Sequence, residues 1–536
     1  MAERTEKNAS LKAQGAWLVF AKVCGFAISF LLPLLIVRYL TQNEVGVYRQ
    51  SFDFITNAIA ILPLGVSMSA YYFLNREEEN RKKTIFNILL FNFVVGGLAC
   101  LGLFIYPQFL GRIYQSAEMT ALAPKIGLVV WIWVFSTFLE TVAIANQEAR
   151  LATVFIILAQ LTKTILMASA VIVFSTVEAF LYAAMIQGIL QTGILLYYLN
   201  SRFPRFWADF SWHFLGEQLH YAVPFGLAGL LWVLQTDIHR YFIGYRFTSA
   251  EYAIYVYGCF QLPLLSVLVE STGAVLISRM SELQARGDKR EIIELSARAM
   301  EKLSFFYFPA YVFMLITASV FITTLFTDKY AASIPIFIIN LTLLPFDIWV
   351  IDPVMRAYKE FGRFLVAFRV FVLIGLVAAL WFGIRYLDLT GMISIVVAIS
   401  LAERFFTTGI LMRKLEVRWS DWKLLKNVGK TGLAALFAGG VMFLVYRQAR
   451  QMMPDLGGAL AGLIFSTPKK TVVEFLSGSL TLGVSFVVFA PVYLFIMNYL
   501  GLIDEEGKGL IRRIPEKLGI ISKDEPVPDP QSRIPN

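Results

Sequence analysis

Charged side chains are scarce in this chain of 536 residues: Asp, Glu, Lys and Arg make up 16%, against roughly 25% in a typical soluble domain. Hydrophobic residues make up 57%, and the mean hydropathy is +0.65. A single soluble core stops growing near ~250–300 residues, so a soluble enzyme of this length has no interior for so many apolar side chains. Aromatic residues at 15% exclude a fibrous or disordered protein as well.

Cysteine and histidine are rare, with three residues of each. The cysteines lie in apolar stretches and are interpreted as small buried hydrophobic residues, which argues against a disulfide framework. The histidines are too few for a zinc enzyme or a histidine-rich catalytic site. We therefore expect no metal and no cofactor. The six residues are Cys24, Cys100, Cys259, His213, His220 and His239.

Apolar windows of about 20 residues recur along the chain, and each is long enough to span a membrane as a helix. We predict an all-α integral membrane protein with about 14 transmembrane helices. The first window, from about Gly15 to Leu40, is too long for the ~7–15 apolar residues of a signal peptide, so we expect a retained helix. The predicted spans are Ala16–Val37, Ser51–Phe73, Ile85–Tyr106, Pro124–Ala145, Ala152–Ser175, Ala179–Leu199, Leu219–Gly244, Tyr252–Ile277, Leu303–Phe326, Ala332–Ile351, Phe364–Ile384, Leu389–Leu411, Val428–Tyr446 and Phe475–Leu500.

The net charge is +9, and the basic residues behind it lie mainly in the connectors between these spans. With both termini in the cytoplasm, the cytoplasmic segments carry 31 of the 47 Lys and Arg residues and the external ones carry 11, Arg49 among them. Cytoplasmic loops of membrane proteins are enriched in basic residues, so this placement indicates a membrane topology rather than nucleic-acid binding.

An internal repeat indicates two similar halves. Thr41–Tyr48 and Thr248–Tyr255 share Thr, Glu and Tyr in register at an offset of 207 residues. Because six spans separate the copies, the halves would be related by a pseudo-two-fold axis along the membrane normal. The predicted domains are an N-terminal six-helix lobe (1–200), an interfacial linker (201–217), a C-terminal six-helix lobe (218–412), two additional helices (413–500) and a partly disordered cytoplasmic tail (501–536).

Three shorter features also lead to predictions. Prolines inside spans, such as Pro63, Pro263 and Pro345, either bend helices or reflect the general frequency of proline in membrane helices. The amphipathic segment 279–302 is expected to form an interfacial helix. The run 456–466 is too short to span a membrane and is expected to be interfacial or re-entrant.

Basic residues inside the spans are the first candidates for a binding site, because each costs about 2.5–3.5 kcal/mol at a helix centre. Lys163 lies near the middle of its span, with Gln160 and Thr164 on the same face, and predicts either a polar cavity or a buried ion pair. Three others lie in cytoplasmic halves, where they either bind an anion or reach the interface. They are Lys22, Arg369 and Arg404.

The remaining candidates are mostly acids. Near the external end of the seventh span, Arg240 adjoins a stripe that contains His239, and Asp237 is expected to point elsewhere. A carboxylate at low dielectric is a candidate proton carrier, and so is His239, although a single histidine is more often structural. Acids and bases balance in the cytoplasmic half, so ion-paired gates fit the sequence as well as an anion-attracting cavity. The acidic candidates are Asp53, Glu140, Asp237, Glu270, Asp347 and Glu403.

The residues Arg38–Tyr48, with Glu44-Val-Gly-Val-Tyr48, resemble the end of the first helix in the oligosaccharide flippase branch of the multidrug/oligosaccharidyl-lipid/polysaccharide (MOP) exporter superfamily. Lys22-Val-Cys-Gly25 resembles a basic element in that helix, and Asp237–Gly244 followed by Tyr255 resembles the pattern of the seventh helix. The second repeat has Ala253 where the family often has glycine. With the predicted spans, the resemblance covers nearly the whole chain.

The resemblance implies a flippase that moves a polyprenyl-diphosphate-linked oligosaccharide to the outer leaflet of the bacterial inner membrane by alternating access. The glycan would serve cell-surface polysaccharide such as O-antigen of lipopolysaccharide, capsule or exopolysaccharide. Lys22 would contact the diphosphate, supported by Lys163, Arg404, Arg369 and Arg240. Carboxylates would couple transport to protons or sodium, and a downstream polymerase or ligase would be a partner.

Three alternatives remain open at this level. A multidrug exporter or a lipid II flippase of the same superfamily would share the fold. A membrane enzyme that processes glycans would be expected to show a large polar loop with catalytic groups, and the sequence has no nucleophile elbow or phosphate loop.

Overall fold

The computed structural model describes residues 17, 20, 23–25, 27–76, 78–464 and 469–503, and every regular element among them is helical. Ten of these helices are long and apolar enough to cross a membrane, or up to 12 when each of two bent pairs counts as one span. The prediction of an all-α membrane protein is thus confirmed, whereas the count of 14 spans stays a prediction. The α-helices are α2 (Gln42–Ile61), α3 (Ala70–Arg76), α4 (Arg81–Ile105), α5 (Gln108–Tyr114), α6 (Ala117–Ser136), α7 (Phe138–Ala145), α8 (Ala149–Val173), α9 (Val177–Arg202), α10 (Trp212–Arg246), α11 (Ser249–Gly258), α12 (Pro263–Ala285), α13 (Lys289–Phe326), α14 (Ser333–Leu341), α15 (Ile351–Ala357), α16 (Lys359–Gly383), α17 (Leu389–Leu415), α18 (Lys426–Ile464) and α19 (Lys470–Tyr499).

Several predicted spans are broken, and proline accounts for part of this. The chain bends by 44° between α2 and the segment Val66–Arg76, and Pro63 lies in the gap. It bends by 46° before α15, where Pro345 lies in a short 3-10 helix. Pro263 begins α12 after a break that separates it from α11. Proline has no N–H to donate, so it favours the first turn of a helix over its interior.

The structure also bears on two shorter segments. The expectation of a separate interfacial helix over 279–302 was wrong, because α12 runs to Ala285 and the 38-residue α13 begins at Lys289, after the three-residue turn 286–288 in which Gly287 has φ 74°. The run 456–466 forms no separate re-entrant segment in its described part, because residues 456–464 continue α18, which is 39 residues long. About 20 helical residues span a bilayer core, so the interfacial alternative for the end of α18 stays a prediction.

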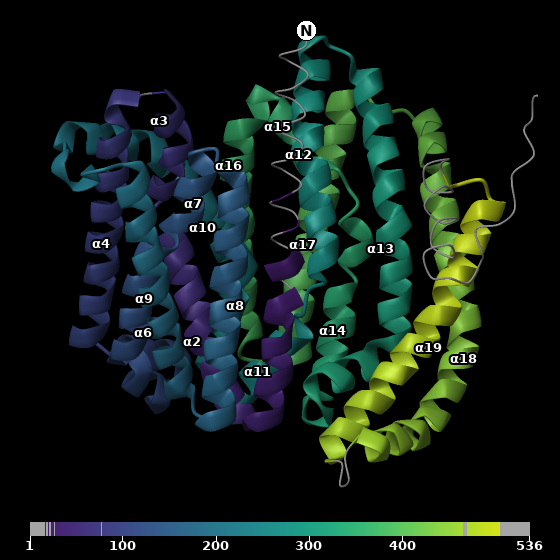
Figure 1. Cartoon of the computed structure of the whole chain (residues 1–536). Helices are drawn as coiled ribbons and strands as arrows, with labels where there is room; N and C mark the ends of the chain where they lie inside the picture. Colours follow the sequence, from purple (N-terminus) through teal and green to yellow (C-terminus); the bar gives the residue numbers. More distant parts are fainter. Residues whose placement is uncertain are drawn as a thin grey trace, which may run out of the picture.

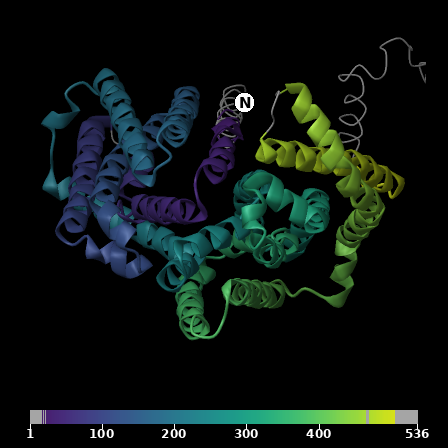
Figure 2. The same cartoon turned by 90° about the horizontal axis from the view of Figure 1, so that it is seen from below.

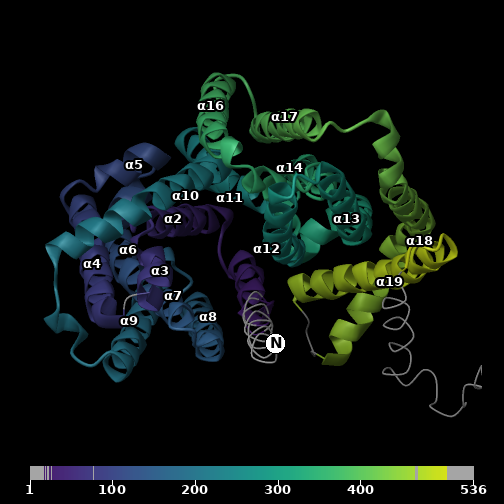
Figure 3. The ribbon, with the colours of Figure 1, turned by 90° about the horizontal axis from the view of Figure 1, so that it is seen from above.

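The helices form two groups that meet around α10 and α11. Figure 1 shows most of them upright, and we call the end where α2 and α11 begin the lower end and the opposite end the upper end. Viewed from above, α2 to α9 gather on one side and α12 to α14 on the other (Figure 3). Helix α10 packs against α2 and α4 on one side and α16 on the other. Helices α18 and α19 pack together and onto α13 at one edge (Figure 2).

The two copies of the repeat begin α2 and α11 with the same capping box. The carboxylate of Glu44 accepts a hydrogen bond from the backbone N–H of Thr41 at 2.8 Å, and the backbone N–H of Glu44 donates to the Thr41 hydroxyl at 3.3 Å. Thr248 and Glu251 make the same pair of bonds at 2.9 and 3.3 Å. Each box satisfies N–H groups that a helix start otherwise leaves unpaired. The pattern Thr-x-x-Glu therefore defines both helix starts.

Helices α2 and α11 pack so closely that one residue has to be glycine. A Cβ added at Gly46 would lie 1.7 Å from the carbonyl oxygen of Ser249. The equivalent position in the second copy is Ala253, which is fully buried. The missing side chain at Gly46 lets the two halves meet at the lower end.

Candidate functional site

A network of four charged side chains joins the two halves near the lower end. Asp53 of α2 lies 3.3 Å from the guanidinium of Arg49, one turn earlier, and 3.8 Å from that of Arg240 of α10. Arg240 also lies 3.3 Å from Asp237. The hydroxyl of Tyr252, from α11, donates to Asp53 at 2.9 Å. We call Arg49, Asp53, Asp237 and Arg240 the lower charge network.

The lower charge network is neutral and largely enclosed. Its two guanidinium groups balance its two carboxylates, and the side chain of Asp53 is only 12% exposed. Asn57 of α2 donates to the Tyr241 hydroxyl of α10 at 3.1 Å, which adds a second link between the same helices. An enclosed and balanced network is costly to break from one side, because removal of one partner leaves the opposite charge uncompensated.

The network corrects two sequence interpretations. Arg49 was placed in an external connector, but the structure has it in the second turn of α2. Asp237 was expected to point away from Arg240, and the two side chains instead form an ion pair. The spacing carried a signal in both cases, since residues three or four apart share one face of a helix.

His239 takes the structural role. Its imidazole is buried and shares a hydrogen bond of 2.8 Å with the hydroxyl of Tyr255. Because Tyr255 closes the second copy of the repeat, this bond ties α11 to α10. His239 therefore has a fixed neighbour, and it does not join the ion pairs beside it.

A second charge cluster ties α10, α15, α16 and α17 together. Arg404 of α17 donates to the carboxylate of Asp347 at 2.5 Å and to the carbonyl oxygen of Phe346 at 2.9 Å. Arg369 of α16 lies 3.7 Å from Asp352, with its guanidinium 5.4 Å from the ring centroid of Trp232. Both predicted anion-binding arginines therefore have carboxylate partners.

Glu403 and its sequence neighbour Arg404 make different contacts. The carboxylate of Glu403 accepts a hydrogen bond from the side-chain amide of Gln235 of α10. This contact joins α10 to α17. Helix α10 therefore contributes to the lower charge network and also contacts the second charge cluster. The sequence predicted the polar face of α17, but it did not reveal these partners from distant segments.

Lys163 differs from every other charged candidate with a described side chain. Its ammonium lies 4.8 Å from the ring centroid of Trp133 of α6. Within the described part of the chain, no carboxylate lies within ion-pair distance of it. The adjacent hydroxyl of Thr164 is buried without a hydrogen-bond partner among the described residues. The N-terminal group thus holds a cation without a carboxylate partner among the described residues.

The remaining candidates are placed less fully. Lys22 lies outside the described residues, and of Glu270 only the backbone, within α12, is described. Glu140 lies in α7 near Tyr71 of α3. Among the described residues, no group of three or more His, Cys, Asp or Glu side chains is arranged to hold a metal ion.

The model of the polysaccharide biosynthesis protein family matches residues 54–335, which is more than half of the chain. The chain therefore belongs to this family. The match spans α4 to α13 and so includes Lys163, Asp237 and Arg240. No curated protein matches the chain.

The chain is similar to several solved transporters. The lipid II flippase MurJ in an inward closed conformation matches with a TM-score of 0.66 and 14% identity, covering 90% of this chain and 98% of that one. A MOP superfamily transporter from Pyrococcus furiosus matches with a TM-score of 0.54 and 15% identity, covering 75% and 95%. An outward-facing multidrug resistance MATE family transporter gives 0.54 and 16%, covering 75% and 95%. The chain thus has the fold of MOP superfamily transporters and is a multi-pass membrane protein.

Proposed function

We propose that this protein is a flippase that moves a polyprenyl-diphosphate-linked oligosaccharide across the membrane for the assembly of cell-surface polysaccharide. Membership of the polysaccharide biosynthesis family and the fold of the MOP superfamily both support the proposal. The observation that carries it is the ammonium of Lys163, which has no carboxylate partner among the described residues. A diphosphate is the anionic part of such a substrate, and charge-assisted hydrogen bonds to phosphate are strong.

Lys163 is favoured over the other described basic candidates because the described part of the chain gives its ammonium no carboxylate partner. Arg240, Arg369 and Arg404 each already lie within 4.0 Å of a carboxylate. A phosphate would have to compete with that carboxylate for the charge of the guanidinium group. We therefore assign these three arginines to gating and positioning, and we keep Lys22, on the resemblance of its motif, as a second phosphate contact.

The lower charge network supports an alternating-access cycle. It links α2 to α10 and α11, so a path that opens at the lower end has to separate these ion pairs. We propose that the upper end faces the cytoplasm, because the basic connectors lie there. The structure then corresponds to a state closed on the external side, in which Lys163 receives substrate from the cytoplasmic leaflet.

Coupling and partners complete the proposal. Glu403 is our candidate for coupling to protons or sodium, because its carboxylate faces Gln235 of α10 instead of an arginine partner at hydrogen-bond distance. The membrane is the bacterial inner membrane, and a polymerase or ligase would use the flipped oligosaccharide. The glycan is O-antigen, capsule or exopolysaccharide, as the source strain dictates.

The test is depletion of the protein followed by mass analysis of polyprenyl-linked saccharides. We expect a complete oligosaccharide repeat to accumulate on its lipid diphosphate. Sensitivity to cationic drugs without any accumulation would instead support a multidrug exporter. Accumulation of lipid II alone would support the peptidoglycan precursor as substrate. Product formation by the purified protein would support an enzyme.

Complementation then tests the site. Lys163→Gln removes the ammonium and is expected to leave the lipid-linked repeat accumulated, whereas Lys163→Arg keeps the charge and restores at least part of the transport. Lys125→Gln is the matched control, since that lysine of α6 is paired with Glu178 of α9. Full complementation by Lys163→Gln at normal protein levels would contradict the assignment.

A further inference from the structure

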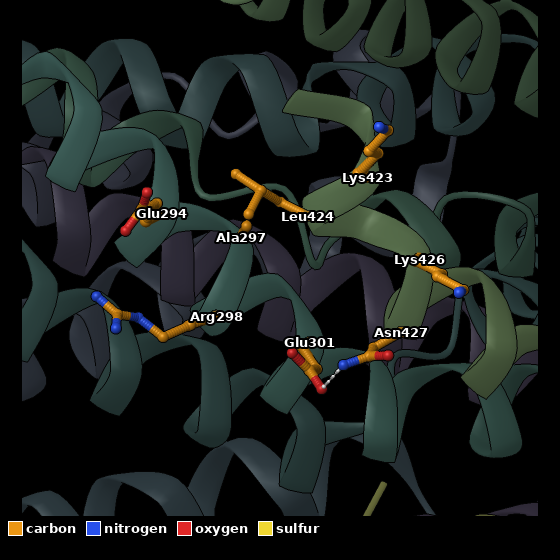
Figure 4. Close-up of a pocket in the computed structure, with 8 residues that line it drawn as sticks. All are labelled: Glu294, Ala297, Arg298, Glu301, Lys423, Leu424, Lys426 and Asn427. Carbon is orange, nitrogen blue, oxygen red and sulfur yellow. Dashed lines mark hydrogen bonds between the residues drawn. The ribbon is translucent and has the colours of Figure 1, made fainter. Parts of the chain in front are cut away.

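A pocket of about 370 Å³ lies at the upper end, between the first turns of α13 and the start of α18. Three basic side chains line it: Arg298 from α13, Lys423 from the 3-10 helix Trp419–Leu425, and Lys426 from α18. In Figure 4, Arg298 stands on one side and the two lysines on the other. The pocket shares no residue with the lower charge network or with Lys163, so neither of those sites accounts for it.

The basic and acidic side chains of the pocket differ in their partners within the described part of the chain. Among the described residues, Arg298, Lys423 and Lys426 have no carboxylate partner. Glu294 is paired with Arg290 at 2.9 Å, and Glu301 accepts a hydrogen bond from the side chain of Asn427 at 2.8 Å (Figure 4). Because the amide of Asn427 is neutral, Glu301 keeps its negative charge, and the three bases minus this one acid leave the described lining with a net charge of +2 for an anion.

The short 3-10 helix beside the pocket is held in place. Asp421, whose side chain is 5% exposed, receives an ion pair from Arg290 of α13 and accepts the backbone N–H of Arg418 at 2.8 Å. Lys289 of α13 also pairs with Glu416, which lies three residues before the 3-10 helix. The pocket walls are thus fixed to each other before any ligand binds, which lowers the entropy cost of binding.

The position of the pocket matches the headgroup level of a membrane. On both helices the exposed residues turn apolar within two to three turns: Phe306 of α13 is 48% exposed, and Leu433 of α18 is 69% exposed. Arg298 precedes Phe306 by eight residues, or about 12 Å along a helix. Trp419 and Trp422 stack beside the pocket and are 89% and 51% exposed. Exposed tryptophans gather at the membrane–water interface.

We propose that this pocket binds the headgroup of an anionic phospholipid. The charged ends of Arg298, Lys423 and Lys426 spread apart in Figure 4, and these long side chains turn toward the phosphate when the lipid binds. The acyl chains run down the apolar surfaces of α13 and α18, and the tryptophan pair rests at the interface. The bound lipid ties the 3-10 helix and α18 to α13, at a distance from the transport path. This inference does not rest on the proposed function, because its chemistry needs only a membrane that contains anionic lipid.

The test measures lipid binding to the purified full chain by native mass spectrometry, with phosphatidylglycerol and phosphatidylcholine as probes. We expect retention of phosphatidylglycerol over phosphatidylcholine. The triple variant R298Q/K423Q/K426Q should bind phosphatidylglycerol about 10- to 100-fold more weakly, since each basic residue near a membrane surface contributes on the order of 1 kcal/mol. The charge-preserving variant R298K/K423R/K426R should bind nearly as well as the parent chain.

The matched control K82Q/K359Q/R363Q removes the same number of charges at the same end but outside the pocket. It should bind phosphatidylglycerol like the parent chain, and equal weakening in both triple variants would overturn the proposal. Displacement of the lipid by millimolar inorganic phosphate would overturn it too, by showing a site for free phosphate. Thermal unfolding without added lipid checks that the variants are folded. The single variants, each expected to weaken binding by a smaller factor, keep the test decisive if the triple variant fails that check.

Discussion

The lower charge network and Lys163 both hold partly buried charge in the same membrane protein, but their partners differ in kind. In the network, two arginines and two aspartates from α2 and α10 neutralise one another and receive a tyrosine hydroxyl from α11. Lys163 has an aromatic ring as its neighbour, without a carboxylate partner among the described residues. The paired charges join helices from the two halves, whereas the single charge lies within one half.

The difference shows that the partners of a charged side chain decide whether it joins helices or remains able to bind an anion. A balanced network gains nothing from a further anion, since each cation already has a carboxylate. An ammonium over an indole ring is stabilised without being neutralised, so it keeps its attraction for an anion. Burial of a charge in a membrane span therefore says little about its role until its partners are known.

The largest expected effect is that of Asp53→Asn. The change leaves Arg49 and Arg240 facing a single carboxylate, and loss of one partner from a buried pair costs roughly 3–5 kcal/mol. Thermal unfolding in detergent measures the loss, with the exposed neighbour Thr56→Ala as control. The double variant Asp53→Asn/Arg49→Gln restores neutrality and should recover part of it. Equal stability of Asp53→Asn and the control would show that the network does not hold the halves together.

A smaller loss of stability is expected for Gly46→Ala, which disturbs the close contact between the backbones of α2 and α11. The added Cβ would meet the carbonyl oxygen of Ser249 at 1.7 Å, so α2 and α11 have to separate. Overpacking of this kind costs about 1–3 kcal/mol. The control is Gly102→Ala in α4, where a Cβ meets nothing within 4 Å and is expected to stabilise the helix slightly. Unchanged stability of Gly46→Ala would mean that the contact is dispensable.

Lys163→Gln sharpens the comparison because its effects on stability and transport should diverge. Loss of the contact with Trp133 costs roughly 0.5–2 kcal/mol at most, well below the effect of Asp53→Asn. Transport of the lipid-linked repeat should nevertheless fall by about tenfold or more, as expected when a charge-assisted phosphate contact is lost. Unfolding and lipid accumulation are measured on the same variant. A stability loss as large as that of Asp53→Asn, with normal transport per folded molecule, would reverse the two roles.

The smallest effect concerns an exposed pair at the upper end. The ammonium of Lys289 lowers the pKa of the Glu416 carboxyl through their hydrogen bond. A lowered folded-state pKa stabilises the fold above the unfolded-state pKa, and this contribution is lost as the pH falls through the folded-state pKa. Exposed pairs are weak, so the unfolding temperature should drop only slightly on acidification. Glu416→Gln should remove the contribution of this pair to the drop in unfolding temperature. If the variant shows the same drop as the parent chain, the pH dependence comes from other groups.

Much of the fold was predictable because it follows from local pattern. Long apolar windows marked most of the membrane helices, and Thr-x-x-Glu marked the starts of α2 and α11. Breaks were harder, because Pro63 and Pro345 bend the chain whereas Pro224 and Pro309 lie inside continuous helices. Whether a helix bends at proline depends on how the neighbouring helices pack around it. The number of spans and the division into lobes at 200 and 218 stay predictions.

The candidate site was predictable residue by residue but not as a set of contacts. The sequence alone determined that this is a membrane protein of about this architecture, and it singled out Lys163, Asp53 and Arg404, because charge in an apolar window is costly wherever the helix packs. Only the tertiary structure decided that Arg404 is paired with Asp347, that Arg49 joins Asp53 and Arg240, and that Lys163 faces Trp133. Partners far apart in the chain meet only when helices pack, and no spacing along one helix can specify which of its neighbours supplies the opposite charge.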